Sequence, residues 1–146
     1  MKLKPVTPTQ SQIENYQRYL KEVNYSIDEL KMLASSFGLN LELVKVESIK
    51  DYEALVLTLL DAGKSVDEII ELAASYLGEV FRNEIGGCWE LCLKDKKYLY
   101  FGLPVISNYA DYPIEFCPSA VLRNFCLSKE PGLINSAINS HREFVK

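Results

Sequence analysis

The sequence predicts an α+β fold, with four or five helices packed on a small antiparallel sheet that has a central hairpin. Helix caps precede several runs of apolar residues at helical spacing. The double glycine Gly86-Gly87 ends one such run, and an aromatic-rich segment interrupted by a polar turn follows it. A segment of this kind is typical of a β-hairpin, which we place at residues 88–103.

Length and composition indicate one globular unit. The chain has 146 residues, of which 48% are hydrophobic and 25% charged, as in ordinary globular domains. We expect a single domain over residues 1–146, with residues 1–10 as a flexible arm. The longest apolar run, residues 55–60, is too short for a membrane span and contains Thr58. We therefore expect a cytoplasmic protein that does not enter a membrane.

Two capping boxes define the helices that we predict near the N-terminus. The first begins at Thr9, and apolar residues at helical spacing extend it over residues 11–23. The second begins at Ser26, and Gly38 is placed to end it as the residue after the helix. Residues 39–47 alternate only in part, so they form either a short strand or an extended connection.

Two more helices are predicted in the middle of the chain. The first runs from Ser48 to about Asp61, and Gly63 ends it. Ser65 begins the second, which reaches about Ile85 and is predicted to be the longest. Its apolar stripe is separated from a polar stripe, so we expect one face to be buried and the other to face solvent. The polar stripe contains Glu68, Glu71, Ser75, Glu79 and Arg82.

The predicted hairpin follows the double glycine. Its strands are residues 88–93 and 97–101, which flank a polar turn at residues 94–96. Residues 104–106 either extend the second strand or begin a third.

The C-terminal part is predicted to be helical after a loop over residues 107–113. Pro118 introduces one helix, which runs to about Ser128. Pro131 is placed like a proline in the first turn of a last helix, which runs to about Phe144.

Catalytic and metal-binding motifs are missing from the sequence. The single histidine, His141, lies five residues from the carboxyl end, in a helix that we expect to fray. Ser-x-x-Lys, Gly-x-Ser-x-Gly, Cys-x-x-Cys and His-Glu-x-x-His do not occur. We therefore predict no catalytic residues, no cofactor and no metal.

The four cysteines are interpreted as small apolar side chains. Cys88 and Cys92 are four residues apart in a predicted strand, which is roughly 13 Å and too far for a disulfide. Cys117 and Cys126 are separated by about the same distance if the chain between them is helical. Pairing between the two groups remains an alternative, although a reducing compartment disfavours it.

Acidic side chains and tyrosines predict a surface that binds a partner. Residues 51–92 carry nine acidic and two basic side chains, and the whole chain has a net charge of -4. An acidic face steers a basic partner, and tyrosines are enriched at interface hot spots. A plain solvated helix face and ordinary hairpin packing are the alternatives. The residues assigned to this surface are Glu68, Glu71, Glu79, Tyr98, Tyr100, Tyr109 and Tyr112.

The double glycine also predicts how the single tryptophan packs. A tight reversal at Gly86-Gly87 allows Trp89 to fold back over Val80 and Phe81. We therefore expect this junction to be the point where the helix and the hairpin join in the core.

The same junction carries a resemblance to known proteins. Leu77-Gly78-Glu79-Val80, followed by Gly86-Gly87 and Trp89, resembles a loose group of small bacterial domains. In that group a Leu-Gly-Glu-Val helix ends at Gly-Gly and leads into a Trp-bearing strand. Residues 112–121 are also similar. The resemblance implies a bacterial α+β domain and carries no catalytic residues across. Some of these domains are similar to small cytoplasmic immunity proteins that neutralise toxins.

Together these patterns favour a protein-binding module, an immunity-type inhibitor that occludes a basic toxin domain. The acidic balance argues against nucleic acid as the partner. The alternative is a small enzyme or ligand-binding domain with a pocket between the hairpin and the helices. Glu84 or Asp111 would act there together with Tyr100, because a carboxyl group on an apolar helix face can have a raised pKa.

Overall fold

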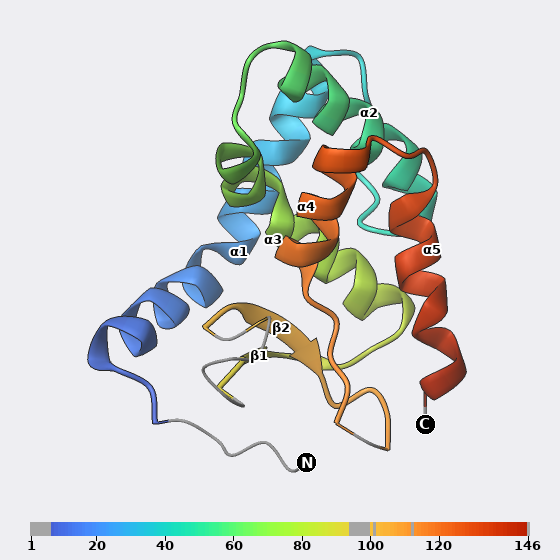
Figure 1. Cartoon of the computed structure of the whole chain (residues 1–146). Coiled ribbons are helices and arrows are strands. Elements are labelled where there is room, and N and C mark those ends of the chain that lie inside the picture. The colour runs from blue at the N-terminus through green and yellow to red at the C-terminus, as the bar shows by residue number, and fades with distance from the viewer. Residues whose placement is uncertain (1–6, 94–99, 101, 112, 146) are drawn as a thin grey trace.

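The computed structural model describes residues 7–93, 100, 102–111 and 113–145. Within these residues, five α-helices pack on a two-stranded antiparallel sheet, so the fold is α+β as predicted. In Figure 1 the sheet lies below most of the helices, with the first half of α1 on one side and the end of α5 on the other.

The first helix, α1 (Gln10–Ser36), is one continuous helix of 27 residues, so the prediction of two helices was wrong. Its capping box is the predicted one: the Gln12 amide donates to the Thr9 hydroxyl, and the Gln12 side chain accepts from the Thr9 amide. Thr9 is therefore part of the helix start and not of an arm; residues 1–6 lie outside the described part.

The second predicted capping box is not used, because the apolar residues on either side of Ser26 are in phase on one helix. Val23, Ile27, Leu30 and Ala34 form a single buried stripe, and neither glycine nor proline interrupts residues 10–36. A potential cap inside such a stripe does not outweigh the burial of the stripe.

Glycines end α1 and α2 (Ile49–Asp61) as predicted. Gly38 and Gly63 have φ of +75° and +92°, a conformation that glycine adopts without a steric penalty. After α1, the Gly38 amide donates to the Ser35 carbonyl and the Leu39 amide to the Ala34 carbonyl, the two bonds of a Schellman motif.

The connection between α1 and α2 is extended and contains no strand. It ends in a 3-10 turn, η1 (Val46–Ser48). Ser48 does not cap α2 with its side chain; its hydroxyl donates instead to the Leu43 carbonyl. The hydroxyl therefore holds the connection in place.

The helix α3 (Val66–Glu84) begins with the predicted capping box of Ser65 and Glu68. It has 19 residues and is shorter than α1, so it is not the longest helix.

Burial of α3 differs from the prediction of one buried and one solvent-facing side. Residues 73–78 are all buried, because α1 packs on one side of α3 and α4 on another, with α2 and β2 also in contact. Ser75, from the predicted polar stripe, is 5% exposed. The centre of α3 is therefore covered all around.

The sheet consists of β1 (Cys88–Leu91) and β2 (Pro104–Ser107), with Cys88 opposite Ser107 and Leu91 opposite Pro104. The second strand of the hairpin is thus residues 104–107. Of the predicted strand 97–101, only Tyr100 is described, and it lies in a turn.

Trp89 packs against Gly78 of α3, a position shortly before the predicted contacts Val80 and Phe81. Its six-membered ring lies so close to Gly78 that an added Cβ would be 2.2 Å from Cη2 of the indole. It also meets Tyr19 edge-on, with the ring centroids 5.3 Å apart. Phe81 stacks instead on Phe116, at a centroid distance of 4.1 Å. Gly78 is therefore the contact point between the hairpin and α3.

Two C-terminal helices close the core. The helix α4 (Pro118–Ser128) has the predicted bounds, while α5 (Leu133–Ser140) starts later and is followed by the 3-10 turn η2 (Arg142–Phe144). The residue before α5 is Gly132, with φ of +84°, so Pro131 is not in the first turn. The Glu53 carboxylate accepts from the amides of Gly132 and Ile134 and caps α5 from α2.

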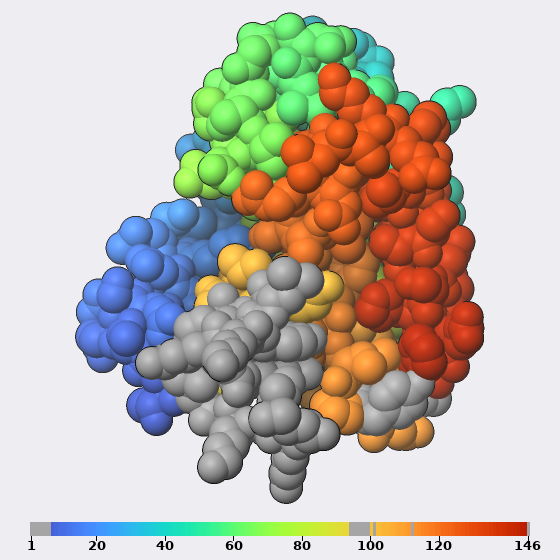
Figure 2. All heavy atoms as spheres, in the orientation of Figure 1, coloured from blue at the N-terminus to red at the C-terminus, as the bar shows by residue number. Residues whose placement is uncertain are grey.

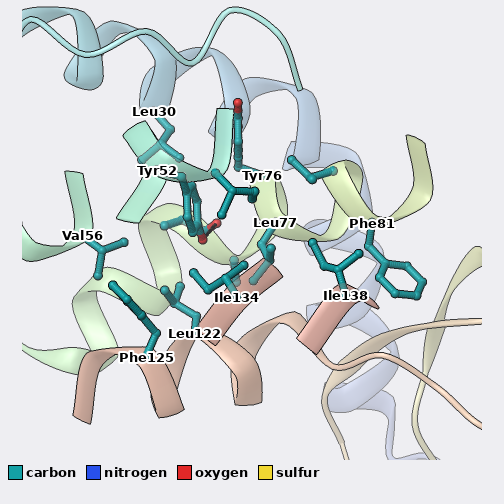
Figure 3. Close-up of a cluster of buried hydrophobic side chains, with 14 of the residues drawn as sticks. Leu30, Tyr52, Val56, Tyr76, Leu77, Phe81, Leu122, Phe125, Ile134 and Ile138 are labelled. Atoms are coloured by element: carbon teal, nitrogen blue, oxygen red, sulfur yellow. Dashed lines mark hydrogen bonds between the residues drawn. The ribbon is translucent and has the colours of Figure 1, made fainter. Parts of the chain in front are cut away.

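One hydrophobic core joins all five helices and β2. Figure 3 shows its centre, where Tyr52 and Tyr76 lie among aliphatic side chains. Their rings are stacked, with centroids 5.4 Å apart. The Tyr52 hydroxyl donates to the Ala73 carbonyl, and that of Tyr76 contacts two carbonyls of the 41–43 segment. Each buried phenol therefore has a partner for its polar end.

The double glycine provides a stability test with an internal control. Gly87 has φ of +92°, and a Cβ added there would lie 2.5 Å from the Ser107 carbonyl oxygen; Gly86 has φ of +112° and open space. We expect Gly86→Ala to cost about 1 kcal/mol of unfolding free energy through backbone strain alone. Gly87→Ala should cost at least about 2 kcal/mol, because the clash adds to the strain. Urea denaturation measures both, and equal losses would contradict this packing.

Candidate functional site

The three glutamates of the predicted surface face different surroundings. Glu68 is exposed, but it completes the cap of α3 and lies 3.6 Å from Lys64. Glu79 is mostly covered, and both of its oxygens accept from Arg82 at 2.9 and 3.0 Å. Glu71 is exposed, and within the described part of the chain it has no hydrogen bond or ion pair. The three therefore do not act as one acidic face.

Most other carboxylates of residues 51–92 are also engaged inside the protein. Asp51 accepts from the Asn40 amide, Glu53 caps α5, and Glu90 accepts from the Ser107 hydroxyl. Asp67 pairs with Arg123 at 2.7 Å and Glu84 with Arg142 at 2.5 Å. The concentration of acidic residues in the sequence therefore overstates the charge that is open to a partner.

The two predicted tyrosines that the structure describes, Tyr100 and Tyr109, do not form a common exposed surface. Tyr109 is 4% exposed, so its assignment to a partner-binding surface was wrong: the ring packs edge-on against Phe81 inside the protein. Tyr100 is half-buried, and burial raises its pKa. Tyr98 and Tyr112 lie outside the described residues.

The residues of the enzymatic alternative are spread over the fold. Glu84 pairs with Arg142 near the C-terminus, and Asp111 is exposed in the loop after β2. Neither belongs to the described lining of the hollow that Tyr100 borders. The structure therefore does not bring either carboxylate together with Tyr100.

A groove runs between α1, α3 and α4, and we call it the Ile70 groove. Its first hollow has a volume of about 350 Å³ and lies where α1 crosses the N-terminal half of α3. This hollow is lined by Tyr19, Glu22, Ser26, Ile70, Glu71, Ala74, Ser75 and Ser119.

The second hollow of the Ile70 groove lies between α3, α4 and the end of the hairpin loop. It has a volume of about 270 Å³. Among the residues that the structure describes, its lining is Ile70, Tyr100, Leu103, Ser119, Ala120, Arg123 and Asn124. Because Ile70 and Ser119 border both hollows, the two are direct neighbours, and we treat them together as the Ile70 groove. In Figure 2 the blue α1, the green start of α3 and the orange α4 come together on the face turned to the viewer.

The floor of the first hollow is closed, and its two rims are acidic. Ala74 and Ser75 are 2% and 5% exposed. Burial raises the pKa of Tyr19 to about 12, although a hydrogen bond with the Ser75 side chain acts in the opposite direction. Tyr19 is therefore a neutral phenol at ordinary pH. Glu22 on α1 and Glu71 on α3 are both exposed above this floor.

The second hollow is mainly apolar. Ile70, Leu103 and Ala120 are partly buried there, while Arg123 and Asn124 on α4 are exposed at its edge. Arg123 is held by Asp67, which leaves its guanidinium paired. The groove thus has an acidic half and an apolar half.

A separate polar hollow of about 500 Å³ lies on the other side of α1, next to the C-terminal half of α3. Asp28 and Lys31 border it from α1, and the Glu79–Arg82 pair borders it from α3. The charges of these four described side chains, two acidic and two basic, sum to zero. Glu71 and Glu79 therefore belong to two different hollows, which the helical wheel of α3 alone does not indicate.

Glu22, Ile70 and Ser119 were missed by sequence reasoning. They come from three helices that lie far apart in the chain, and none stands in a recognisable motif. Only the packing of α1 and α4 on α3 brings them together.

Comparison with known protein families, with curated proteins and with solved structures finds no match to this chain. Among the described residues, no group of histidine, cysteine, aspartate and glutamate side chains is arranged to hold a metal ion. None of the described helices combines the length and the apolar character that crossing a bilayer requires. What the chain can do therefore follows from the chemistry of its surface and hollows.

The histidine is part of an aromatic cluster and is not on a frayed end. The His141 ring meets Phe81 and Phe116 edge-on, with centroids 5.5 Å from each. Its Nδ1 lies 2.7 Å from the Tyr109 hydroxyl, which donates to it when the ring is neutral with its proton on Nε2. Burial lowers the pKa of His141. This cluster joins the C-terminal turn to α3.

The cluster predicts a dependence of stability on pH. Because the pKa of His141 is lower in the folded than in the unfolded chain, its contribution to stability is complete above the unfolded pKa of about 6.5. The contribution is lost as the pH falls below that value toward the folded pKa. We expect the unfolding free energy of the wild type to decrease between about pH 7.5 and 5.5.

His141→Phe should flatten this decrease, because phenylalanine keeps the aromatic packing but does not titrate. The variant will be less stable at neutral pH, since the Tyr109 hydroxyl loses its partner. Urea denaturation at each pH measures both effects. An equal slope in the two proteins would show that His141 does not cause the dependence.

Proposed function

We propose that this chain is a protein-binding module, an immunity-type inhibitor that neutralises a basic toxin domain by occluding it. We place the docking surface at the Ile70 groove. The observation that carries this proposal is that Glu22 and Glu71 stand at one open hollow without partners in the described part of the chain. Most of the other acidic groups of the central helices are neutralised internally.

Electrostatics and packing both support this choice of surface. The net charge of -4 favours approach of a basic partner. At the groove, unpaired carboxylates lie beside an apolar hollow, and an apolar centre with charged neighbours is the usual composition of an interface. The resemblance of residues 76–89 to domains similar to immunity proteins suggests a toxin as the partner.

A ligand-binding domain is the second candidate, and one observation favours it. The hollow bordered by Tyr100, Leu103 and Ala120 lies between the hairpin loop and the helices, where this alternative places its pocket. A small apolar molecule that shifts the resonances of this hollow and raises the melting temperature would support it.

Charge reversal tests the docking surface. The partner tested is the product of the gene next to this one, and the affinity is measured by biolayer interferometry at low and moderate salt. We expect Glu71→Lys to weaken binding by about tenfold at low salt, mainly through slower association, because a steering carboxylate becomes a repelling cation. The loss should shrink as salt screens the charges.

Glu143→Lys is the matched control, because it changes the net charge equally at an exposed position in η2, near the other end of the molecule. It should have much less effect. Equal losses in the two variants would mean that only net charge matters, and binding unchanged in Glu71→Lys would place the docking surface elsewhere.

A further inference from the structure

We infer that the Ile70 groove recognises a short extended segment of its partner in which a basic and an apolar side chain are separated by one residue. The basic side chain enters the hollow between Glu22 and Glu71, and the apolar side chain enters the hollow lined by Leu103 and Ala120. This inference rests on the proposed function and specifies the chemistry of the partner.

The acidic hollow suits a single cation. Glu22 comes from α1 and Glu71 from α3, so a lysine or arginine end between them meets carboxylates from two helices. The floor of the hollow, Ala74 and Ser75, is almost closed to solvent. A cation there has protein instead of water on its floor side, and it is attracted by both carboxylates above the floor. Tyr19 adds a neutral aromatic surface to the lining.

The adjoining hollow suits an aliphatic side chain. Ile70, Leu103 and Ala120 supply apolar surface, and the volume of about 270 Å³ is small. The hydroxyl of Ser119 and the amide of Asn124 border the same hollow and are available to the polar backbone of a bound segment. Arg123 also borders this hollow, but its guanidinium is already paired with the Asp67 carboxylate. It therefore does not favour an acidic ligand over a basic one.

The arrangement of the two hollows sets the spacing of the side chains. Both are bordered by Ile70 and Ser119, so they are direct neighbours on one face of the molecule. In an extended segment, side chains two residues apart point to the same side and are roughly 7 Å apart. Such a pair fits two adjoining hollows, whereas side chains next to each other in the segment would point to opposite sides.

Synthetic peptides test this pattern on the full chain. The probe is acetyl-Gly-Arg-Gly-Leu-Gly-amide, followed by amide resonances in nitrogen-15 NMR spectra. We expect shifts at Ile70, Ala74 and Ala120. Replacing the leucine of the peptide by serine should weaken binding by about tenfold through lost apolar burial. Replacing its arginine by glutamine should weaken binding about threefold, and only at low salt.

Variants of the chain separate the two hollows. Glu22→Gln with Glu71→Gln should abolish the preference for arginine and keep the preference for leucine. Ala120→Phe should fill the apolar hollow, so it should abolish the preference for leucine and keep the preference for arginine. Glu143→Gln, compared with Glu71→Gln alone, is the control for net charge. If Ala120→Phe does not fold, the double glutamine variant still decides the question, because both of its positions are exposed.

Several results would overturn the inference: no shifts in the groove at millimolar peptide, preferences that the variants leave unchanged, or equal binding, at low salt, of a leucine peptide without arginine. Groove resonances that shift with protein concentration alone would assign the groove to a second copy of the chain. A toxin domain that binds without displacing the peptide would overturn the inference but leave the proposed function intact. Peptide binding as expected, without any toxin protection, would reject the proposed function alone.

Discussion

The close approach of other elements to all sides of α3 is the constraint on which the rest of this structure depends. Small residues on α3 allow it, because Ala73, Ala74 and Ser75 let α1 and the core approach the helix axis. Gly78 leaves room for the Trp89 ring, which a Cβ would displace. Interiors are close-packed, so such contacts tolerate little added volume. The Ile70 groove lies where this cover of α3 is incomplete, at the N-terminal half of the helix.

Internal contacts engage most of the acidic side chains on the central helices α2 and α3, which leaves fewer of them open to a partner than the sequence suggests. Glu53 caps α5 from another helix, Glu79 holds Arg82, and Glu84 ties the end of α3 to Arg142. Carboxylates at helix N-termini and in partly covered ion pairs stabilise the fold. The two carboxylates of the groove, Glu22 and Glu71, make no such contact among the described residues, and they lie together at one hollow, where a basic partner can meet both.

Buried tyrosines show why aromatic content alone predicts a surface poorly. Tyr52 and Tyr76 are fully buried, and their hydroxyls are bonded to backbone carbonyls. The hydroxyl of Tyr109 is bonded to a side chain, the Nδ1 atom of His141. A tyrosine whose hydroxyl finds a partner is as suitable for a core as for an interface. Of the predicted tyrosines, Tyr100 alone is both described and at the groove.

The sequence by itself determined where most helices begin and end, because a cap or a terminal glycine acts within a few residues, as at Ser65 and Gly38. It also determined the fold class and the reversal at Gly86-Gly87. The tertiary structure alone decided that α1 is continuous, that residues 104–107 pair with β1, and that Glu22 faces the same hollow as Glu71. These features depend on burial and pairing between segments far apart in the chain, and no local pattern carries that information.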